Sequence, residues 1–128
     1  MRVLLDTHAL LWWLADDDRL AKSARDVIGD QSNEVLVSAA TAWEIATKVR
    51  IGKLPQHAGV ASDLPMHLAA QGFGALAITI EHGQRAGLLP GPHRDPFDRM
   101  LIAQAHSECI PLVSNEDIFD RYGVTRIW

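Results

Sequence analysis

Residues 3–15 read VLLDTHALLWWLA, an apolar run that Asp6 interrupts before it continues as an apolar, helix-like segment. Val3, Leu4 and Leu5 are apolar at consecutive positions, which is typical of a central parallel strand buried on both faces. Asp6 directly follows this strand. Because ligands bind at the carboxyl ends of the strands in open parallel α/β sheets, this stretch predicts such a fold with Asp6 at its ligand-binding edge.

The rest of the chain repeats this alternation of strand and helix. Strands are predicted at residues 2–5, 34–37, 75–78 and 111–113, with a short terminal strand at 125–128. Helices are predicted at residues 8–15, 20–29, 38–50, 58–71, 81–88 and 96–107, the fourth bent at Pro65. The pattern predicts an α/β fold in which helices cover both faces of a parallel sheet. No repeat or linker interrupts it, so we expect one domain spanning residues 1–128.

Acidic side chains recur where the predicted strands end or the following helices begin: Asp6, Glu44, Asp98 and Glu116. Carboxylates gathered at one edge of a sheet repel one another unless a cation neutralises them. Hard oxygen ligands of this kind suit Mg²⁺ or Mn²⁺. The four acids therefore predict a divalent metal site, and a metal-dependent phosphodiesterase explains such a site best.

Each acid also has a structural explanation. Asp6 could cap the first helix, and Asp98 would be favourable in the first turn of its helix. Glu44 and Lys48 could form an ordinary i, i+4 pair on a helix surface, worth about 0.2–0.5 kcal/mol. Glu116 could be part of a polar loop. None of these explanations predicts that acids should recur at several strand ends.

Composition and cysteine use indicate the compartment. No apolar stretch approaches the roughly 18 residues of a membrane span, and the chain passes from Met1 straight into a strand, so we expect neither a membrane segment nor a cleaved signal peptide. A single cysteine, Cys109, excludes an internal disulfide and fits a reducing cytoplasm. Cys109 has no activating neighbours in the sequence, so we predict a small core residue and not a nucleophile.

The formal net charge of −4 is not typical of proteins that bind nucleic acid through a bulk positive field. Two bound divalent cations would cancel this charge. Lys48 and Arg99 could then contact phosphates near the site.

Three other polar or aromatic features are given no catalytic role. Residues 16–18, all Asp, are predicted to form a solvated turn in which Asp18 caps the next helix. The six histidines show no close pair with zinc-ligand spacing. Trp12 and Trp13 are adjacent and point about 100° apart on a helix. We expect one of them in the core and the other as a candidate for an interface.

Four segments together resemble a PIN domain, and more narrowly the VapC-type toxins of bacterial type II toxin–antitoxin pairs: residues 5–12, 38–45, 95–105 and 112–116. The resemblance covers nearly the whole chain in the order of the family. It implies a three-layer α/β/α sandwich with a central parallel sheet. It also implies a Mg²⁺- or Mn²⁺-dependent endoribonuclease, commonly a homodimer, that a small antitoxin holds inactive.

Three residues match the main acids of the family: Asp6, Glu44 and Asp98. Ser114 matches its hydroxyl position, and Glu116 stands where the family usually has Asp. A glutamate is longer but could still reach a metal, so we keep Glu116 as the fourth ligand. Asp95 belongs to the same motif as Asp98, and we interpret it as the helix cap that positions Asp98.

Two rival functions lack residues that they need. A phosphoacceptor receiver domain requires a second acid beside Asp6 and a lysine after the last strand, but Thr7 follows Asp6 and no lysine follows Lys53. A phosphohydrolase with an aspartyl nucleophile requires another Asp at the position of His8. A PIN fold kept only as a binding module remains an alternative. If the chain is a ribonuclease, its substrate is expected to be a loop or single-stranded RNA, whose bases are accessible.

Overall fold

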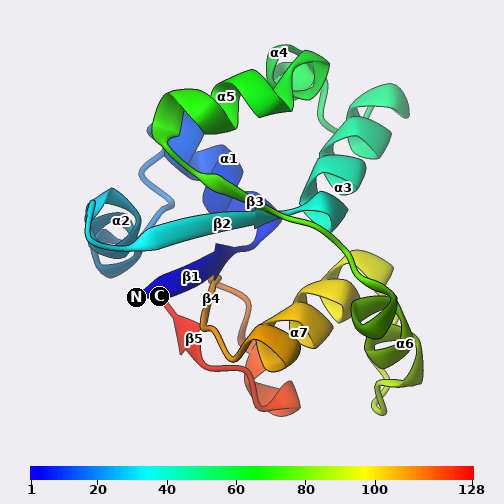
Figure 1. The fold of residues 1–128 in the computed structure, drawn as a ribbon. Coiled ribbons are helices and arrows are strands. Elements are labelled where there is room, and N and C mark those ends of the chain that lie inside the picture. The colour runs from blue at the N-terminus through cyan, green and yellow to red at the C-terminus, as the bar shows by residue number, and fades with distance from the viewer.

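The computed structural model describes residues 1–128 and has a five-stranded sheet at its centre, in the order β3-β2-β1-β4-β5 (Figure 1). The strands are β1 (Arg2–Leu5), β2 (Glu34–Ser38), β3 (Gly74–Leu76), β4 (Leu112–Val113) and β5 (Arg126–Ile127). All four neighbouring pairs are parallel. The chain builds the sheet from β1 towards β3 and then returns to the other side of β1 for β4. The strand order therefore reverses between β1 and β4, which is the position where such sheets bind ligands.

Helices cover both faces of the sheet, as predicted (Figure 1). The α-helices are α1 (Thr7–Leu14), α2 (Lys22–Gly29), α3 (Ala39–Arg50), α4 (Ala58–Ser62), α5 (Leu64–Gln71), α6 (Ile80–Leu88) and α7 (Pro96–Glu108). Two 3₁₀ turns complete the chain, η1 (Pro55–His57) and η2 (Asp117–Tyr122). The predicted three-layer α/β/α sandwich is confirmed.

Successive residues of the central strand pack into different cores, because side chains alternate across a strand. Val3 and Leu5 join the larger core beneath α1, α2, α3 and α5. Leu4 joins the second core beneath α7 and η2. All three side chains are fully buried. The uninterrupted apolar run is therefore explained by two cores that each receive part of the same strand.

Several predicted boundaries were wrong. The third strand ends at Leu76 and not at residue 78, and the helix predicted at residues 58–71 is two helices. Asp63 separates these helices and caps α5, and its Oδ1 accepts a hydrogen bond from the Met66 N–H. Pro65 lies in the first turn of α5, where proline is tolerated. It therefore helps to start a helix and does not bend one.

The region around α2 also differs from the prediction. The helix begins at Lys22 after Ala21, which makes no side-chain cap, so Asp18 does not start it. Leu20 is buried in the larger core, and its apolar side chain made the helical pattern look longer than the helix is. The turn at residues 16–18 is largely solvent-exposed, as predicted.

Cys109 is exposed, so its assignment to the core was wrong. It ends α7 in the left-handed conformation with φ of 55°. This conformation directs the chain into β4 and leaves the thiol outside the core. None of the helices is long and apolar enough to cross a membrane.

Candidate active site

The four predicted acids and Ser114 lie at the carboxyl end of the sheet. Asp6 directly follows β1, and its N–H donates to the Val113 carbonyl of β4 at 3.0 Å. It therefore lies at the point where the strand order reverses. Ser114 follows β4 and Glu116 precedes η2, whereas Glu44 and Asp98 lie on α3 and α7.

Asp6 both caps α1 and provides a buried carboxyl group. Its Oδ1 accepts from the Ala9 N–H at 2.8 Å, so the helix-cap explanation is confirmed. Burial raises the pKa of Asp6 to about 6, and the negative charge of Glu116 adds to this rise, while hydrogen bonds from Ser114 and Ala9 oppose it. A carboxyl group that is costly to ionise here becomes more stable as an anion when a cation is nearby.

Glu44 is buried and does not form the exposed surface pair considered from the sequence. Its carboxylate accepts hydrogen bonds from the Thr7 hydroxyl and the Lys48 ammonium group. Partial burial opposes the charged form of Lys48, but the bond to Glu44 and the charges of Asp95 and Asp98 raise its pKa overall. Lys48 therefore serves as an internal counter-ion among the acids.

Asp98 lies in the first turn of α7 and is paired with His93. The Nε2 atom of His93 lies 2.8 Å from Asp98 Oδ2. Burial raises the pKa of Asp98 to about 6, the bond to His93 lowers it, and the charges of Asp95 and Glu116 raise it further. Asp95 is the helix cap, as predicted, because its Oδ1 accepts from the N–H groups of Phe97 and Asp98 at 2.9 and 3.1 Å.

Glu116 is the most exposed of the four acids, with 39% of its side chain accessible. Its Oε1 lies 3.7 Å from His8 Nδ1, and this interaction holds the pKa of Glu116 below its usual value. The Glu116 N–H donates to the Ser114 hydroxyl at 3.0 Å. Ser114 thus links the loop of Glu116 to Asp6.

The structure brings the acids within electrostatic reach but does not assemble them as ligands of one ion. No three acidic, histidine or cysteine side chains converge closely enough to hold a metal together. Partners already occupy three of the carboxylates: Lys48 on Glu44, His93 on Asp98, and His8 on Glu116. The oxygen donors are of the type that suits a divalent cation. The ion pairs of Glu44, Asp98 and Glu116 would have to separate before these carboxylates could converge on such a cation.

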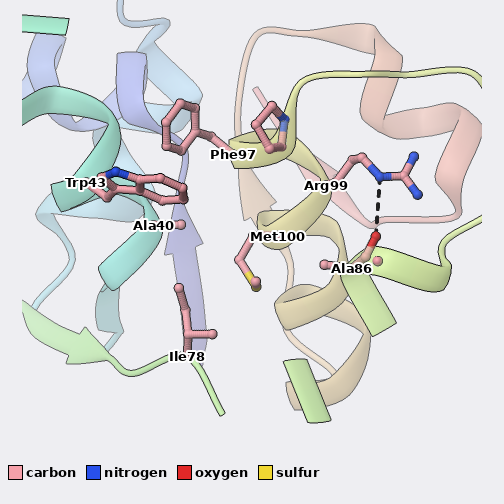
Figure 2. Close-up of a pocket in the computed structure, with 9 residues that line it drawn as sticks. Ala40, Trp43, Ile78, Ala86, Phe97, Arg99 and Met100 are labelled. Carbon is pink, nitrogen blue, oxygen red and sulfur yellow. Dashed lines mark hydrogen bonds between the residues drawn. The ribbon is translucent and has the colours of Figure 1, made fainter. Parts of the chain in front are cut away.

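Sequence reasoning missed the histidine partners and misassigned Arg99. His8 and His93 pair with acids, but they come from different segments and share no recognisable spacing. Arg99 donates to the carbonyl oxygen of Ala86 at 3.3 Å (Figure 2). It also donates to the carbonyl oxygens of His93, at 2.9 Å, and Leu89. Its guanidinium group is hydrogen-bonded to the end of α6 and to the connection between α6 and α7. It is therefore not free to contact a phosphate, and the expected phosphate contact is not supported.

Residues 3–124 of the chain match the family model described as PIN domain. The chain belongs to the PIN domain family. This PIN domain is 31% identical over 104 residues to Ribonuclease VapC22 of Mycobacterium tuberculosis, covering 80% of this chain and 78% of that protein. It is 40% identical over 68 residues to Ribonuclease VapC16 of the same organism, and that match spans only 50% of this chain and 48% of the relative.

Solved structures share the fold of this PIN domain. The VapBC2 structure from Rickettsia felis bound to a promoter DNA fragment has a TM-score of 0.70 at 17% identity, covering 98% of this chain and 97% of that one. M. tuberculosis VapC20, described as a sarcin-ricin loop cleaving toxin, has a TM-score of 0.71 at 13% identity and 96% coverage of both chains. VapBC-1 from nontypeable Haemophilus influenzae has a TM-score of 0.65 at 13% identity, covering 98% of this chain and 96% of that one.

Replacing Lys48 by Met is expected to destabilise the metal-free PIN domain, because Glu44 would remain buried without its cation. We expect a loss of roughly 1–2 kcal/mol in the free energy of unfolding, since the ammonium group is partly exposed and partly screened. Urea unfolding in EDTA measures the loss. Lys22→Met removes an exposed i, i+4 pair with Asp26 and should have little effect. Equal losses in the two variants would contradict the role of Lys48 as an internal counter-ion.

Proposed function

We propose that this PIN domain is a divalent metal-dependent endoribonuclease and the toxin of a toxin–antitoxin pair. The observation that carries the proposal is the pair of carboxyl groups at the reversal point of the sheet, the buried Asp6 and the partly buried Asp98. Each has a pKa raised to about 6, and each is further raised by the charge of Glu116. The curated relatives named as ribonucleases support the same reaction class.

The four acids fit a divalent cation through the chemistry of their donors. Asp6 and Asp98 would hold the principal Mg²⁺ or Mn²⁺, with Glu44 and Glu116 completing its shell or holding a second ion. When bound, such an ion supplies an activated water and stabilises the charge that develops on the scissile phosphate. Like-charge repulsion among the carboxylates supports cation binding here, because a cation relieves it.

Neighbouring residues would hold the acids in place for this reaction. The cap on α1 and the Ser114 hydroxyl restrain Asp6, and the cap of Asp95 restrains Asp98. The proposed substrate is a loop or single-stranded segment of RNA, because sequence-specific recognition requires unstacked bases. The resemblance to VapC-type toxins implies products with 5′-phosphate and 3′-hydroxyl ends. The formal charge of −4 requires that cations at the site, and not the overall field, attract the phosphate.

Incubation of total RNA with the wild-type protein and Mg²⁺, alongside Asp6→Ala, tests the proposal directly. We expect discrete cleavage by the wild type, none in EDTA, and little by the variant. End mapping should find 5′-phosphate groups. Binding of RNA without cleavage under any divalent metal would instead favour the alternative of a catalytically silent binding module. The receiver-like alternative is not supported, because the chain belongs to the PIN domain family.

An antitoxin is the proposed regulator of this site. Two of the similar solved structures are described as VapBC assemblies. The acids would favour binding of an arginine side chain from such a partner, because a guanidinium group pairs bidentately with a carboxylate. A bound arginine would compete with the metal. If this is correct, Asp98→Asn should weaken binding of the antitoxin as well as removing activity.

Homodimerisation is also proposed, but through a different surface from the one that the sequence suggested. Trp12 and Trp13 both pack against the larger core. The Trp12 ring lies 5.6 Å from that of His8, and Trp13 Nε1 donates to Gln71 at 3.0 Å. Both tryptophans thus have partners within the chain. The most exposed large apolar side chains are instead Ile80 and Leu88, at the two ends of α6.

Replacing Ile80 by Asp is expected to convert the proposed dimer to a monomer, because a charge would be buried at the contact. Light scattering at tens of micromolar protein measures the mass. Met66→Asp on α5 is the matched control, because Met66 is also an exposed apolar residue. A monomeric wild type, or a dimer that both variants retain, would contradict this surface.

A further inference from the structure

An apolar groove of about 240 Å³ lies between α3, α7 and the C-terminal end of α6, with Ile78 of the β3–α6 connection also in its lining. Figure 2 shows Trp43 and Ala40 on one side, Phe97 and Met100 on the other, and Ile78 at one end. Trp43 is 62% exposed, which is unusual for so large an apolar residue. Its ring meets Phe97 edge to face, with 4.9 Å between centroids and 74° between planes.

The groove adjoins the candidate active site through the chain itself. Trp43 immediately precedes Glu44 on α3, and Phe97 immediately precedes Asp98 on α7. Adjacent helical residues point about 100° apart. Each helix therefore directs its acid towards the other acids and its aromatic ring towards the groove. A nucleic acid with a phosphate at the acids would have a neighbouring base within reach of Trp43.

The lining of the groove favours an uncharged, flat ligand. Arg99 is the only charged residue among those that line it. Its guanidinium group is already bonded to the carbonyl oxygens of Ala86, Leu89 and His93, so it is not available to a phosphate. The remaining surface is aromatic and aliphatic, which is the surface on which proteins stack bases of single-stranded nucleic acids.

The size of the groove also favours a single ring system. Pockets for drug-sized ligands are roughly 300–1,000 Å³, so a volume of about 240 Å³ suits a smaller group. A stable protein interface needs about 800 Å² from each partner, which is far more than this groove can supply by itself. A nucleobase satisfies the size, the flatness and the position beside the acids.

We propose that this groove is a base-stacking subsite, in which Trp43 receives the base next to the phosphate that is cleaved. The proposal rests on the proposed ribonuclease function and adds a determinant of substrate choice to it. Phe97 packs edge to face with the Trp43 ring, and most of the Trp43 surface stays exposed for stacking. Trp43 would thereby select single-stranded RNA, because a base within a duplex cannot leave its stack without cost.

The first test measures binding of a fluorescein-labelled single-stranded RNA by anisotropy with Ca²⁺ in place of Mg²⁺, which keeps a hard cation available to the acids, and gel electrophoresis checks that the RNA stays intact during the measurement. Trp43→Ala is expected to weaken binding roughly 5- to 150-fold, the range for loss of one stacked base. Trp43→Phe should retain most of the affinity, because phenylalanine also presents an aromatic face. Met66→Ala, which removes an exposed apolar side chain on α5, is the control and should bind as the wild type does.

The second test places one abasic nucleotide at each position of the same RNA in turn. At one position, the loss caused by Trp43→Ala should disappear, because the base that it stacks is already missing. Additive losses at every position, or wild-type affinity in Trp43→Ala, would overturn the subsite. So would dissociation of a dimer by Trp43→Ala with RNA affinity unchanged, since the groove would then be a protein interface.

These outcomes separate the subsite from the catalytic function. Cleavage by the wild type with no effect of Trp43→Ala overturns the subsite alone. A wild type that binds this RNA through Trp43 but never cleaves it supports the subsite and rejects the nuclease. A wild type that neither binds nor cleaves RNA overturns both.

Discussion

Replacing any one of Asp6, Glu44 or Asp98 by Ala is expected to remove most RNA-cleaving turnover, and replacing all three should remove little more. Residues that serve one catalytic unit give strongly non-additive losses. A metal site provides several kcal/mol of transition-state stabilisation, so each single change should cost roughly 10²- to 10⁴-fold in rate. The loss should be the same whichever acid is removed first.

Single-turnover cleavage of a labelled RNA at saturating Mg²⁺ measures these losses. Asp26→Ala provides the control, because Asp26 is an exposed acid on α2 outside the site. Full activity of Asp98→Ala, or undiminished cleavage in excess EDTA, would rule out the mechanism. Additive losses would mean that the acids act separately and do not share a metal.

Asp6→Asn should make the metal-free protein more stable near neutral pH while abolishing its activity. Asn is as good a helix cap as Asp, so the change removes the charge and keeps the cap on α1. Burial raises the pKa of Asp6 from 3.8 to about 6 in the folded protein. The ionised carboxyl group therefore opposes folding by up to about 3 kcal/mol at neutral pH.

The direction of the pH dependence follows from this shift. The folded state binds the proton more tightly than the unfolded state, so the stability contributed by protonated Asp6 is complete below about pH 4. It is lost as the pH rises through about 6. Urea unfolding in EDTA should thus show a fall in wild-type stability across this range, and a smaller fall in Asp6→Asn, where the raised pKa of Asp98 still contributes.

Added Mg²⁺ provides the complementary measurement. A ligand that binds only the folded state raises the melting temperature by mass action. The wild type should gain more from Mg²⁺ than Asp6→Asn does, because the variant has lost a carboxylate ligand. Equal shifts in the two proteins would identify Asp6 as a helix cap alone.

The sequence alone was sufficient for the architecture and for part of the site. Consecutive apolar residues in β1 predicted a strand buried on both faces, and the alternation with helices predicted the parallel sheet. Asp6 was placed at its carboxyl end, and Asp95 was identified as the cap of α7. These features are local, because caps and strand patterns depend on neighbouring residues. The end of β3 and the division between α4 and α5 were missed. The apolar periodicity at these positions is weak over only a few residues, so it does not predict where an element ends.

Only the tertiary structure decided how the acids are partnered and which tryptophan is exposed. The sequence left open an exposed surface pair of Glu44 with Lys48, but Glu44 is buried against Thr7, which lies 37 residues away in the chain. Trp43, which the sequence did not single out, is more exposed than Trp12 or Trp13. Periodicity assigns a residue to one face of a helix, but what covers that face depends on segments that are distant in the chain. Burial, ion pairing and the resulting pKa values therefore arise only when those segments pack together.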